Sequence, residues 1–320
     1  MGEERIRNAF VLAAGYGTRL RPLSRVVPKP AWPLFDVPLA ARVLDLIAAA
    51  GLRRAIVNLH HLPEVLRARL EPWIPGGLDV AWSFEPEILG TGGALAPWRE
   101  TLRPEPFVLA NADTYQEIDL PAMVREHAAN GALATLSVAP AAGGPLEVDE
   151  EGRIVRFLDA RAPGAGAGRP CEFTGIHVLE PEVLDHVPDR RCCINADVHR
   201  HLVARGAPVF AHVLPADAFW SDLGTVERYL SAHRDLLARG RVPRAPGEVV
   251  ETEGGRWYRG TGARIGVGAR VGPGCAVGRG AEIAPGARLA GSVVWPGARC
   301  GDAVGCVVPD VGPVVGARIP

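Results

Sequence analysis

The chain has 320 residues, with 35 basic and 36 acidic side chains and 48% hydrophobic residues. This length and apolar content are enough for two domains with ordinary cores. Because the charges balance and no basic run occurs, we expect no nucleic-acid partner. The longest apolar stretch, residues 38–52, is interrupted by Arg42 and Asp45 and is too short to span a bilayer, so we expect no membrane partner either.

The N-terminus and the cysteines favour a cytoplasmic protein. The first eight residues, MGEERIRN, carry acids as well as bases, which is unlike an export signal. None of the six cysteines is spaced C-x-x-C. A disulfide scaffold and a zinc site are therefore not expected.

A single lysine stands out in the composition. Of the 35 basic residues 34 are arginine, and the only lysine is Lys29, within the run VVPKP. Chance is one explanation. The other is that this position needs a compact, mobile ammonium group, which a planar guanidinium does not replace.

Short apolar segments alternate with helix-like segments from Arg7 to about Gly240. The pattern predicts helices over 39–50, 63–70 and 121–129, and β-strands over 9–13, 55–59, 78–84, 106–111, 134–139, 175–179 and 209–214. This alternation predicts an α/β fold with a doubly wound, Rossmann-like, mostly parallel sheet. Ligands bind such sheets beyond the carboxyl ends of the strands, so the residues after Ala13, Phe84 and Asn111 are candidates for a site.

The composition changes after Pro243. The residues from Gly260 on hold 15 of the 38 glycines, and their apolar residues recur at every sixth position: Ile265, Val271, Val277, Ile283, Leu289 and Trp295. One inward side chain per short strand is the hexapeptide pattern of a parallel β-helix, here of about three coils. The segment resembles the left-handed β-helix of hexapeptide-repeat proteins.

These patterns divide the chain into an α/β domain over 1–240, a linker over 241–259 and a β-helix over 260–320. A β-helix this short has an open end that needs cover. The first domain or a second subunit would provide it, so a homo-oligomer through the β-helix is one expected arrangement.

The run LAAGYGTRL, residues 12–20, directly follows the first predicted strand. Its small residues let a ligand approach the backbone, and its amides can surround phosphates. The run is not a Walker loop, which needs G-x-x-x-x-G-K-[ST], and Arg19 stands neither at the position of a Walker lysine nor at that of the third glycine of a dinucleotide fingerprint. Taken alone, a glycine-containing turn between a strand and a helix can be merely structural, because every doubly wound sheet has several, or it can bind a ligand.

Residues 12–30, LAAGYGTRLRPLSRVVPKP, closely resemble the nucleotide-binding signature of the sugar-1-phosphate nucleotidyltransferases, the pyrophosphorylases that make NDP-sugars. Further matches follow in order: GTGGAL from Gly90, NAD from Asn111, FTGIHVL from Phe173 and WSDLGTVERY from Trp220. The resemblance covers about residues 1–240. It is to members that act as mannose-1-phosphate guanylyltransferases and N-acetylmuramate-1-phosphate uridylyltransferases, and several such families append a left-handed β-helix.

The resemblance implies that an NTP and a sugar 1-phosphate react to give an NDP-sugar and pyrophosphate. The nucleophile is already an anionic oxygen, so catalysis needs alignment and charge neutralisation rather than a general base. By resemblance, Arg19 binds the β- and γ-phosphates and Lys29 the phosphate under attack, while Asp113 and Asp222 hold Mg²⁺. Either aspartate could instead be a turn or cap residue.

The resemblance also implies binding residues. Thr91 occupies the position where some thymidylyl and uridylyl relatives carry a glutamine that reads the pyrimidine edge, so a pyrimidine site of that kind is not expected. The nucleotide-binding residues carried over are Leu12, Ala13, Ala14, Gly15, Gly17, Thr18, Arg19, Thr91, Gly92 and Asn111. Those for the sugar phosphate are Gly144, Glu172, Thr174 and Gly175.

One family feature is missing on the sugar side. Many relatives carry Glu-Lys at the end of a strand, where the lysine meets the sugar phosphate. Here Asp159 and Ala160 stand in those places. Either Arg161 substitutes for the lysine or the phosphate is held otherwise.

We therefore expect a Mg²⁺-dependent sugar-1-phosphate nucleotidyltransferase that uses GTP with mannose 1-phosphate or another hexose 1-phosphate. The alternative in the same class is a uridylyltransferase, for example one acting on N-acetylmuramic acid 1-phosphate. A hexapeptide acyltransferase and a non-catalytic sensor of sugar nucleotides are the alternatives from other classes.

Overall fold

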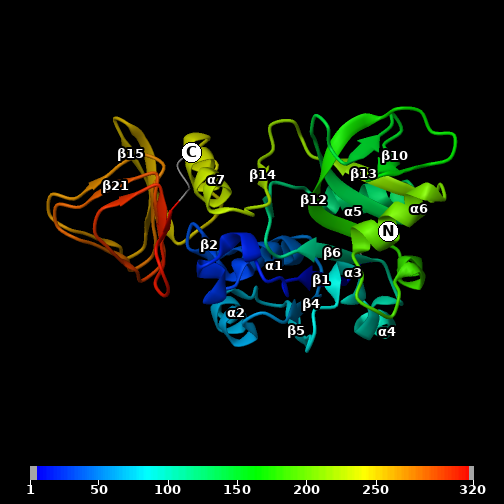
Figure 1. The fold of residues 1–320 in the computed structure, drawn as a ribbon, viewed down its shortest axis with the longest axis horizontal. Helices are drawn as coiled ribbons and strands as arrows, with labels where there is room; N and C mark the ends of the chain where they lie inside the picture. Colours follow the sequence, from blue (N-terminus) through cyan, green and yellow to red (C-terminus); the bar gives the residue numbers. More distant parts are fainter. Residues whose placement is uncertain (1–5, 317–320) are drawn as a thin grey trace. The chain divides into compact units, whose positions relative to one another are not determined.

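The computed structural model describes residues 6–316 (Figure 1). Two compact units share the chain. Unit 1 comprises Met1–Gly15, Arg42–Pro63 and Ile74–Trp220, and unit 2 comprises Tyr16–Ala41, Glu64–Trp73 and Ser221–Pro320. The domain boundaries inferred from the sequence remain a prediction, and two strands, β15 (Gly247–Thr252) and β16 (Gly255–Gly260), lie in the segment expected to be a linker.

Unit 1 is built on one ten-stranded sheet with the path β11-β10-β9-β12-β6-β1-β4-β5, in which β8 pairs with β12 and β13. β1 pairs in parallel with β4 and β6, and β4 with β5, whereas β12 runs antiparallel to β6, β8 and β9. The strands are β1 (Asn8–Leu12), β4 (Arg54–Leu59), β5 (Asp79–Phe84), β6 (Phe107–Asn111), β8 (Ala134–Pro140), β9 (Leu146–Val148), β10 (Ile154–Phe157), β11 (Ala160–Arg161), β12 (Arg169–Leu179) and β13 (Val209–Val213). The predicted α/β fold is thus confirmed, with a mixed sheet.

The central strands of the sheet are buried, and the edge strand is less so. β1, β4 and β6 are almost continuous apolar runs and are buried along most of their length, as expected for parallel strands covered on both faces. β5 lies at the edge of the sheet and is only partly buried. Ligand chemistry is therefore expected where β1, β4 and β6 end, not along their length.

Seven α-helices and seven shorter helical turns occur within residues 6–316. The α-helices are α1 (Leu39–Ala49), α2 (Pro63–Leu70), α3 (Gly90–Gly93), α4 (Arg99–Leu102), α5 (Leu120–Ala129), α6 (Arg200–Ala204) and α7 (Val226–Ala238). Shorter turns of helix are η1 (Thr18–Leu20), η2 (Leu23–Arg25), η3 (Lys29–Ala31), η4 (Glu71–Trp73), η5 (Ala96–Trp98), η6 (Pro181–His186) and the π-helix η7 (Ile194–His199). No helix within residues 6–316 is long and apolar enough to cross a membrane.

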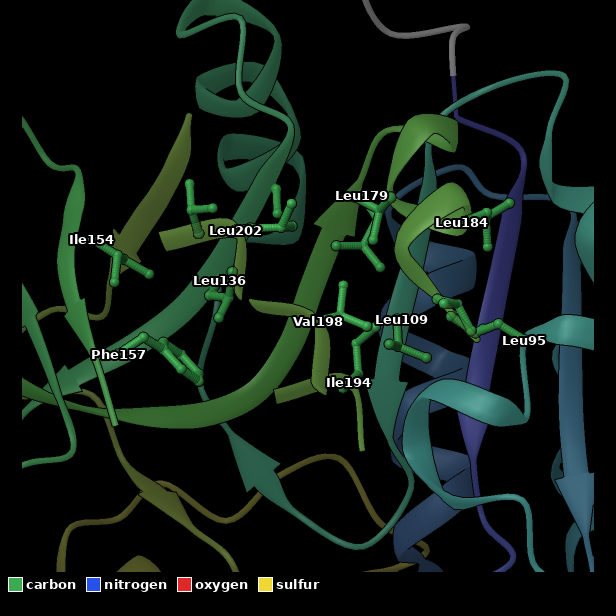
Figure 2. Close-up of a cluster of buried hydrophobic side chains, with 14 of the residues drawn as sticks. Leu95, Leu109, Leu136, Ile154, Phe157, Leu179, Leu184, Ile194, Val198 and Leu202 are labelled. Atoms are coloured by element: carbon green, nitrogen blue, oxygen red, sulfur yellow. The ribbon is translucent and has the colours of Figure 1, made fainter. Parts of the chain in front are cut away.

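The core of unit 1 joins the sheet to the helices that cover it. Figure 2 shows Leu109 of β6, Leu136 of β8 and Leu179 of β12 close to Val198 of η7 and Leu202 of α6. All five side chains are at most 2% exposed. This packing makes a rigid base for the loops at the strand ends.

The C-terminal part of unit 2 is a stack of very short strands in three sheets: β15-β16-β19-β22-β25-β26, β17-β20-β23 and β18-β21-β24. Within it Ile265 pairs with Ile283 and Val271 with Leu289, in parallel, so the chain returns to the same sheet after three strands. This arrangement fits the predicted β-helix (Figure 1). Its strands are β17 (Arg264–Ile265), β18 (Arg270–Val271), β19 (Ala276–Val277), β20 (Glu282–Ile283), β21 (Arg288–Ala290), β22 (Val293–Val294), β23 (Arg299–Cys300), β24 (Ala303–Val304), β25 (Cys306–Val308) and β26 (Val315–Gly316).

The six-residue period breaks after Leu289. Ile283 is paired with Ile265 at a separation of 18 residues, but Val277 pairs with Val294 at a separation of 17. Val294 therefore joins the interior cluster of the β-helix. The expectation that Trp295 is the next inward residue is wrong, because a shift of one residue turns a strand side chain to the other face.

Candidate active site

The predicted nucleotide loop begins at the end of the central strand of unit 1. Leu12 is the last residue of β1 and pairs with Asn111 of β6, and its carbonyl accepts a hydrogen bond of 3.0 Å from the Ala112 amide. The next residues, Ala13 and Ala14, are buried, whereas Gly15 is exposed. The structure thus places Leu12 and Asn111, two predicted nucleotide-binding residues, on adjacent strands at the same end of the sheet.

Two buried residues that the sequence analysis missed support this loop. Asn58, at the end of β4, accepts a hydrogen bond from the Ala13 amide at 2.6 Å. Its Nδ2 donates to Oε1 of Glu85 at 2.7 Å, and Oε2 of Glu85 accepts from the Leu89 amide at 2.9 Å. One carboxylate therefore ties the loop after β1 to the turn that precedes α3. The available signal was a pair of polar residues at the ends of otherwise apolar strands.

The GTGG run forms the four-residue helix α3, which packs closely on the segment before η7. A Cβ at Gly92 would lie 2.7 Å from Sγ of Cys192, so no side chain fits there. The Thr91 hydroxyl accepts a hydrogen bond from the Ile194 amide at 2.9 Å. Both residues thus have a structural task in unit 1, and their proposed contact with a nucleobase remains a prediction.

The predicted sugar-phosphate residues gather along β12. Glu172, Thr174 and Gly175 lie on this strand, and Gly144 packs against the carbonyl of Cys171, the residue before Glu172. Gly175 has φ 117°, and a Cβ there would lie 2.8 Å from Oγ1 of Thr114, in the loop that also carries Asp113.

The Thr174 hydroxyl has partners inside unit 1. The residue is 1% exposed, and its Oγ1 lies 2.7 Å from both Oε1 of Gln116 and Oγ of Ser137. The Gln116 amide in turn donates to the Thr174 carbonyl at 3.0 Å. Thr174 therefore holds the Gln116 side chain against β12, which is a structural role.

The segment where relatives carry Glu-Lys is held by ion pairs. Arg200 binds Asp159 through two hydrogen bonds of 2.5 and 2.8 Å and holds the pKa of that carboxyl at about 2. Arg161, the candidate substitute for the missing lysine, donates to Glu147 at 2.8 Å. The Arg161 guanidinium thus already forms an ion pair on the surface of unit 1.

The predicted catalytic cations gather in unit 2 around Asp222. Lys29 is 5% exposed, and its Nζ donates to the Asp222 carbonyl. Nη2 of Arg19 lies 3.7 Å from Oδ2 of Asp222. Arg228, which the sequence analysis missed, donates from Nη1 to Oδ1 of Asp222 at 2.5 Å. Arg228 lies in the first turn of α7, where the cap residue Thr225 accepts its amide at 3.2 Å.

Gly224 makes room for this cluster. A Cβ on it would lie 2.6 Å from Nη2 of Arg19, so only a glycine allows the guanidinium to rest on this backbone. The Gly224 amide also donates to Oδ1 of Asp222 at 3.2 Å. The run SDLG after Trp220 thus holds the aspartate and leaves space for the arginine.

The cluster carries excess positive charge. Burial by itself would raise the pKa of Asp222, but the Arg228 hydrogen bond, the Gly224 amide and the charge of Lys29 outweigh it and lower the pKa. Three cations thus surround one ionised carboxylate. Such a surplus suits a polyanion, and groups held in advance stabilise charge that develops during a reaction.

The donor set also fits one divalent ion. Arg228 and the Gly224 amide approach Oδ1 of Asp222, whereas Oδ2 faces Arg19 at 3.7 Å, beyond hydrogen-bond distance. A carboxylate oxygen is the ligand that Mg²⁺ prefers, and this ion commonly takes its other ligands from substrate phosphates and water. Within residues 6–316 no group of three or more His, Cys, Asp or Glu side chains is arranged to hold a metal.

Comparison with known proteins agrees with this chemistry. Residues 8–239 match the family described as nucleotidyl transferase. A mannose-1-phosphate guanylyltransferase from Mycobacterium tuberculosis is 34% identical over 310 residues, which is 94% of this chain and 82% of that enzyme. A UTP–glucose-1-phosphate uridylyltransferase from Synechocystis is 31% identical over 249 residues, 72% of this chain and 63% of that enzyme.

Mannose-1-phosphate guanylyltransferase 1 from Arabidopsis thaliana is 30% identical over 238 residues, 72% of this chain and 64% of that enzyme. The chain thus spans less than two thirds of the Synechocystis and Arabidopsis proteins. Among solved structures, HddC from Yersinia pseudotuberculosis has a TM-score of 0.57 at 23% identity, covering 71% of this chain and 97% of that one, which supports the fold alone. These matches confirm the predicted resemblance.

Proposed function

We propose a function on one premise: the chain belongs to the nucleotidyl transferase family. The proposed reaction joins a sugar 1-phosphate to the α-phosphorus of a nucleoside triphosphate and releases pyrophosphate. The observation that carries the proposal is the cluster in unit 2, in which Arg19, Lys29 and Arg228 gather around Asp222. The cluster has the charge and the preorganisation that this reaction needs.

The chemistry assigns a task to each cation. A phosphate oxygen of the sugar 1-phosphate attacks the α-phosphorus, and the bond from that phosphorus to the bridging oxygen of pyrophosphate breaks. In the proposal, Arg19 binds the β- and γ-phosphates and so stabilises the leaving group. Lys29 contacts the phosphate under attack. Arg228 keeps Asp222 ionised and oriented.

Asp113 and Asp222 are the proposed Mg²⁺ ligands. The ion, when bound, neutralises phosphate charge as the pyrophosphate departs. Asp222 supports this assignment because its pKa is lowered, which keeps the carboxylate ionised. Its Oδ2 is the oxygen that remains beyond hydrogen-bond distance of Arg19.

GTP with mannose 1-phosphate or another hexose 1-phosphate is the proposed substrate pair. The relative that matches 94% of this chain is named a mannose-1-phosphate guanylyltransferase, which supports this choice. A uridylyltransferase is the second candidate, because a relative of similar identity is named for UTP and glucose 1-phosphate. The absence of a lysine after Asp159 leaves the sugar phosphate to be bound by other residues.

Pyrophosphate release tests the proposal. Each of four nucleoside triphosphates is combined with mannose, glucose, galactose and N-acetylmuramic acid 1-phosphates, with Lys29→Ala as the control for this site. We expect turnover for GTP with mannose 1-phosphate and a GDP-sugar product by mass spectrometry. Preference for UTP would select the second candidate. A folded protein that binds GDP-mannose but releases no pyrophosphate with any pair would be a sensor, and acyl transfer from acyl-CoA would identify an acyltransferase.

A further inference from the structure

We propose that the β-helix positions Lys29, so that nucleotidyl transfer depends on residues of the C-terminal segment that never touch substrate. The proposal rests on the proposed function, in which Lys29 contacts the phosphate under attack. Residues 27–38, here called the lysine segment, carry Lys29. One set of contacts lies inside this segment and two sets join it to the β-helix, all within unit 2.

The first contacts close the backbone turn that presents Lys29. The Trp32 amide donates to the Lys29 carbonyl at 2.9 Å, and the Trp32 indole donates to the Val27 carbonyl at 3.1 Å. Trp32 is fully buried. The position of its indole thus sets the position of the turn on both sides of Lys29.

The second set joins that indole to the β-helix. The Trp295 ring meets the Trp32 ring edge to face at 5.4 Å between centroids, and Tyr229 of α7 meets Trp32 at 5.1 Å. The Trp295 indole donates to the Tyr229 hydroxyl at 3.1 Å, and this hydroxyl donates to the Pro33 carbonyl. A chain of two hydrogen bonds therefore runs from the β-helix to the backbone next to Trp32.

The one-residue break in the repeat makes these contacts available. An unbroken six-residue period would turn Trp295 into the interior of the β-helix, where Val294 lies instead. Trp295 is nevertheless fully buried, because it packs on Trp32 and Tyr229. The irregularity thus places a large side chain against the lysine segment.

The third set holds the tip of a hairpin in the lysine segment. β2 (Pro33–Leu34) pairs with β3 (Val37–Pro38) across Phe35 and Asp36, which have φ angles of 49° and 71°. A two-residue turn with two positive φ angles is normally made by Asn-Gly or Asp-Gly, so this turn needs outside support. Oδ1 of Asp36 accepts from the Arg279 amide at 2.7 Å, and Oδ2 accepts from the Tyr258 hydroxyl at 2.8 Å.

Aromatic contacts of Phe35 also hold the tip of this hairpin. The Phe35 ring packs on Tyr258 at 5.3 Å and on His233 of α7 at 4.7 Å. The lysine segment is thus held at its turn by Trp295 and at its tip by β16 and the strand region near Arg279. Small displacements of a positioned group reduce catalysis more than they reduce binding.

A variant series separates positioning from stability. Trp295→Phe removes the indole donor, and Tyr229→Phe removes the hydroxyl but keeps the buried ring. Leu289→Ala is the matched control, because Leu289 lies in the interior cluster of the β-helix and its truncation should destabilise the β-helix from inside. Each change is made in the wild-type protein and in Lys29→Ala, and kcat, KM for both substrates and Tm are measured on the full chain.

We expect Trp295→Phe and Tyr229→Phe each to lower kcat about tenfold with little change in either KM. In Lys29→Ala they should slow turnover less than twofold, because their effect passes through the lysine, while their effect on Tm persists. Leu289→Ala should lower Tm and leave kcat unchanged at temperatures well below Tm.

Two results would overturn the proposal. One is a wild-type kcat for both aromatic variants, and the other is an equal slowing with and without Lys29. Wild-type turnover of Lys29→Ala itself would overturn both this proposal and the assigned role of Lys29. If Trp295→Phe fails to fold, Tyr229→Phe decides the question, since it removes one oxygen from the same hydrogen-bond chain.

Discussion

Replacing Lys29 by arginine keeps the charge and changes only the geometry. Lys29 is 5% exposed, and its ammonium reaches the Asp222 carbonyl. A planar guanidinium is broader and does not fit the same point contact. Loss of one preorganised contact to developing charge costs about 10²- to 10³-fold in rate, roughly 3–4 kcal/mol. We therefore expect Lys29→Arg to be nearly as slow as Lys29→Ala, with little change in KM for the nucleotide.

The assay is pyrophosphate release at saturating substrates and Mg²⁺, beside melting curves for each variant. The larger side chain in a buried position should also lower stability by about 1–3 kcal/mol, which melting will show separately from the rate. Arg25→Lys is the control, because Arg25 is an exposed cation in the same region of the sequence. Turnover of Lys29→Arg within about threefold of wild type, with Lys29→Ala slow, would show that charge matters and that the geometric argument is wrong.

Three further changes test the site and the core. Asp222→Asn should slow pyrophosphate release about 10²-fold at saturating Mg²⁺ with a Tm near that of wild type, and retained turnover would make Asp222 structural. Gly224→Ala should raise KM for the nucleotide severalfold without a large change in Tm, because the new Cβ would lie 2.6 Å from the flexible Arg19 side chain and displace it. Gly301→Ala is the control and should change neither quantity, because a Cβ at Gly301 meets no atom of residues 6–316 within 4 Å. Burial lowers the pKa of His127 to about 4 and that of His199 to about 3, so below pH 6.5 the unfolded chain takes up protons that the folded chain does not. As the pH falls from 6.5 towards the pKa of each buried histidine, the free energy of unfolding should therefore decrease by about 1.4 kcal/mol per pH unit for each of the two. Equal unfolding free energies, measured in urea at pH 7.5 and pH 5, would contradict this.

Local patterns were enough to find most elements. The strand predicted over 55–59 is β4 (Arg54–Leu59), and the helix predicted over 63–70 is α2 (Pro63–Leu70). Apolar periodicity and the placement of proline act over a few residues, so they can be read from the chain. The antiparallel pairing of β12 with β6, β8 and β9 could not be read, because partners are chosen by packing between distant segments.

The candidate site, like the fold, was predicted in part from local patterns and in part could not be. The signature run and the later SDLG run pointed to Lys29 and Asp222, and the structure joins them across 193 positions of sequence. Asn58, Glu85 and Arg228 were missed, since each supports the site through a contact that motif spacing does not record, and a polar residue at the end of a strand was a signal for the first two alone. Motifs record the groups that meet a ligand more clearly than the groups that hold them.

By itself, the sequence determined the α/β class, the repeat in the C-terminal segment and the candidate cations, because these depend on residue type and short-range spacing. Only the tertiary structure decided where the repeat breaks. The pairing of Val277 with Val294 moves Trp295 out of the β-helix and against Trp32, next to the turn that presents Lys29. Side-chain direction in a strand alternates with every residue, so one shift in pairing, invisible in the periodic pattern, reverses which face a residue occupies.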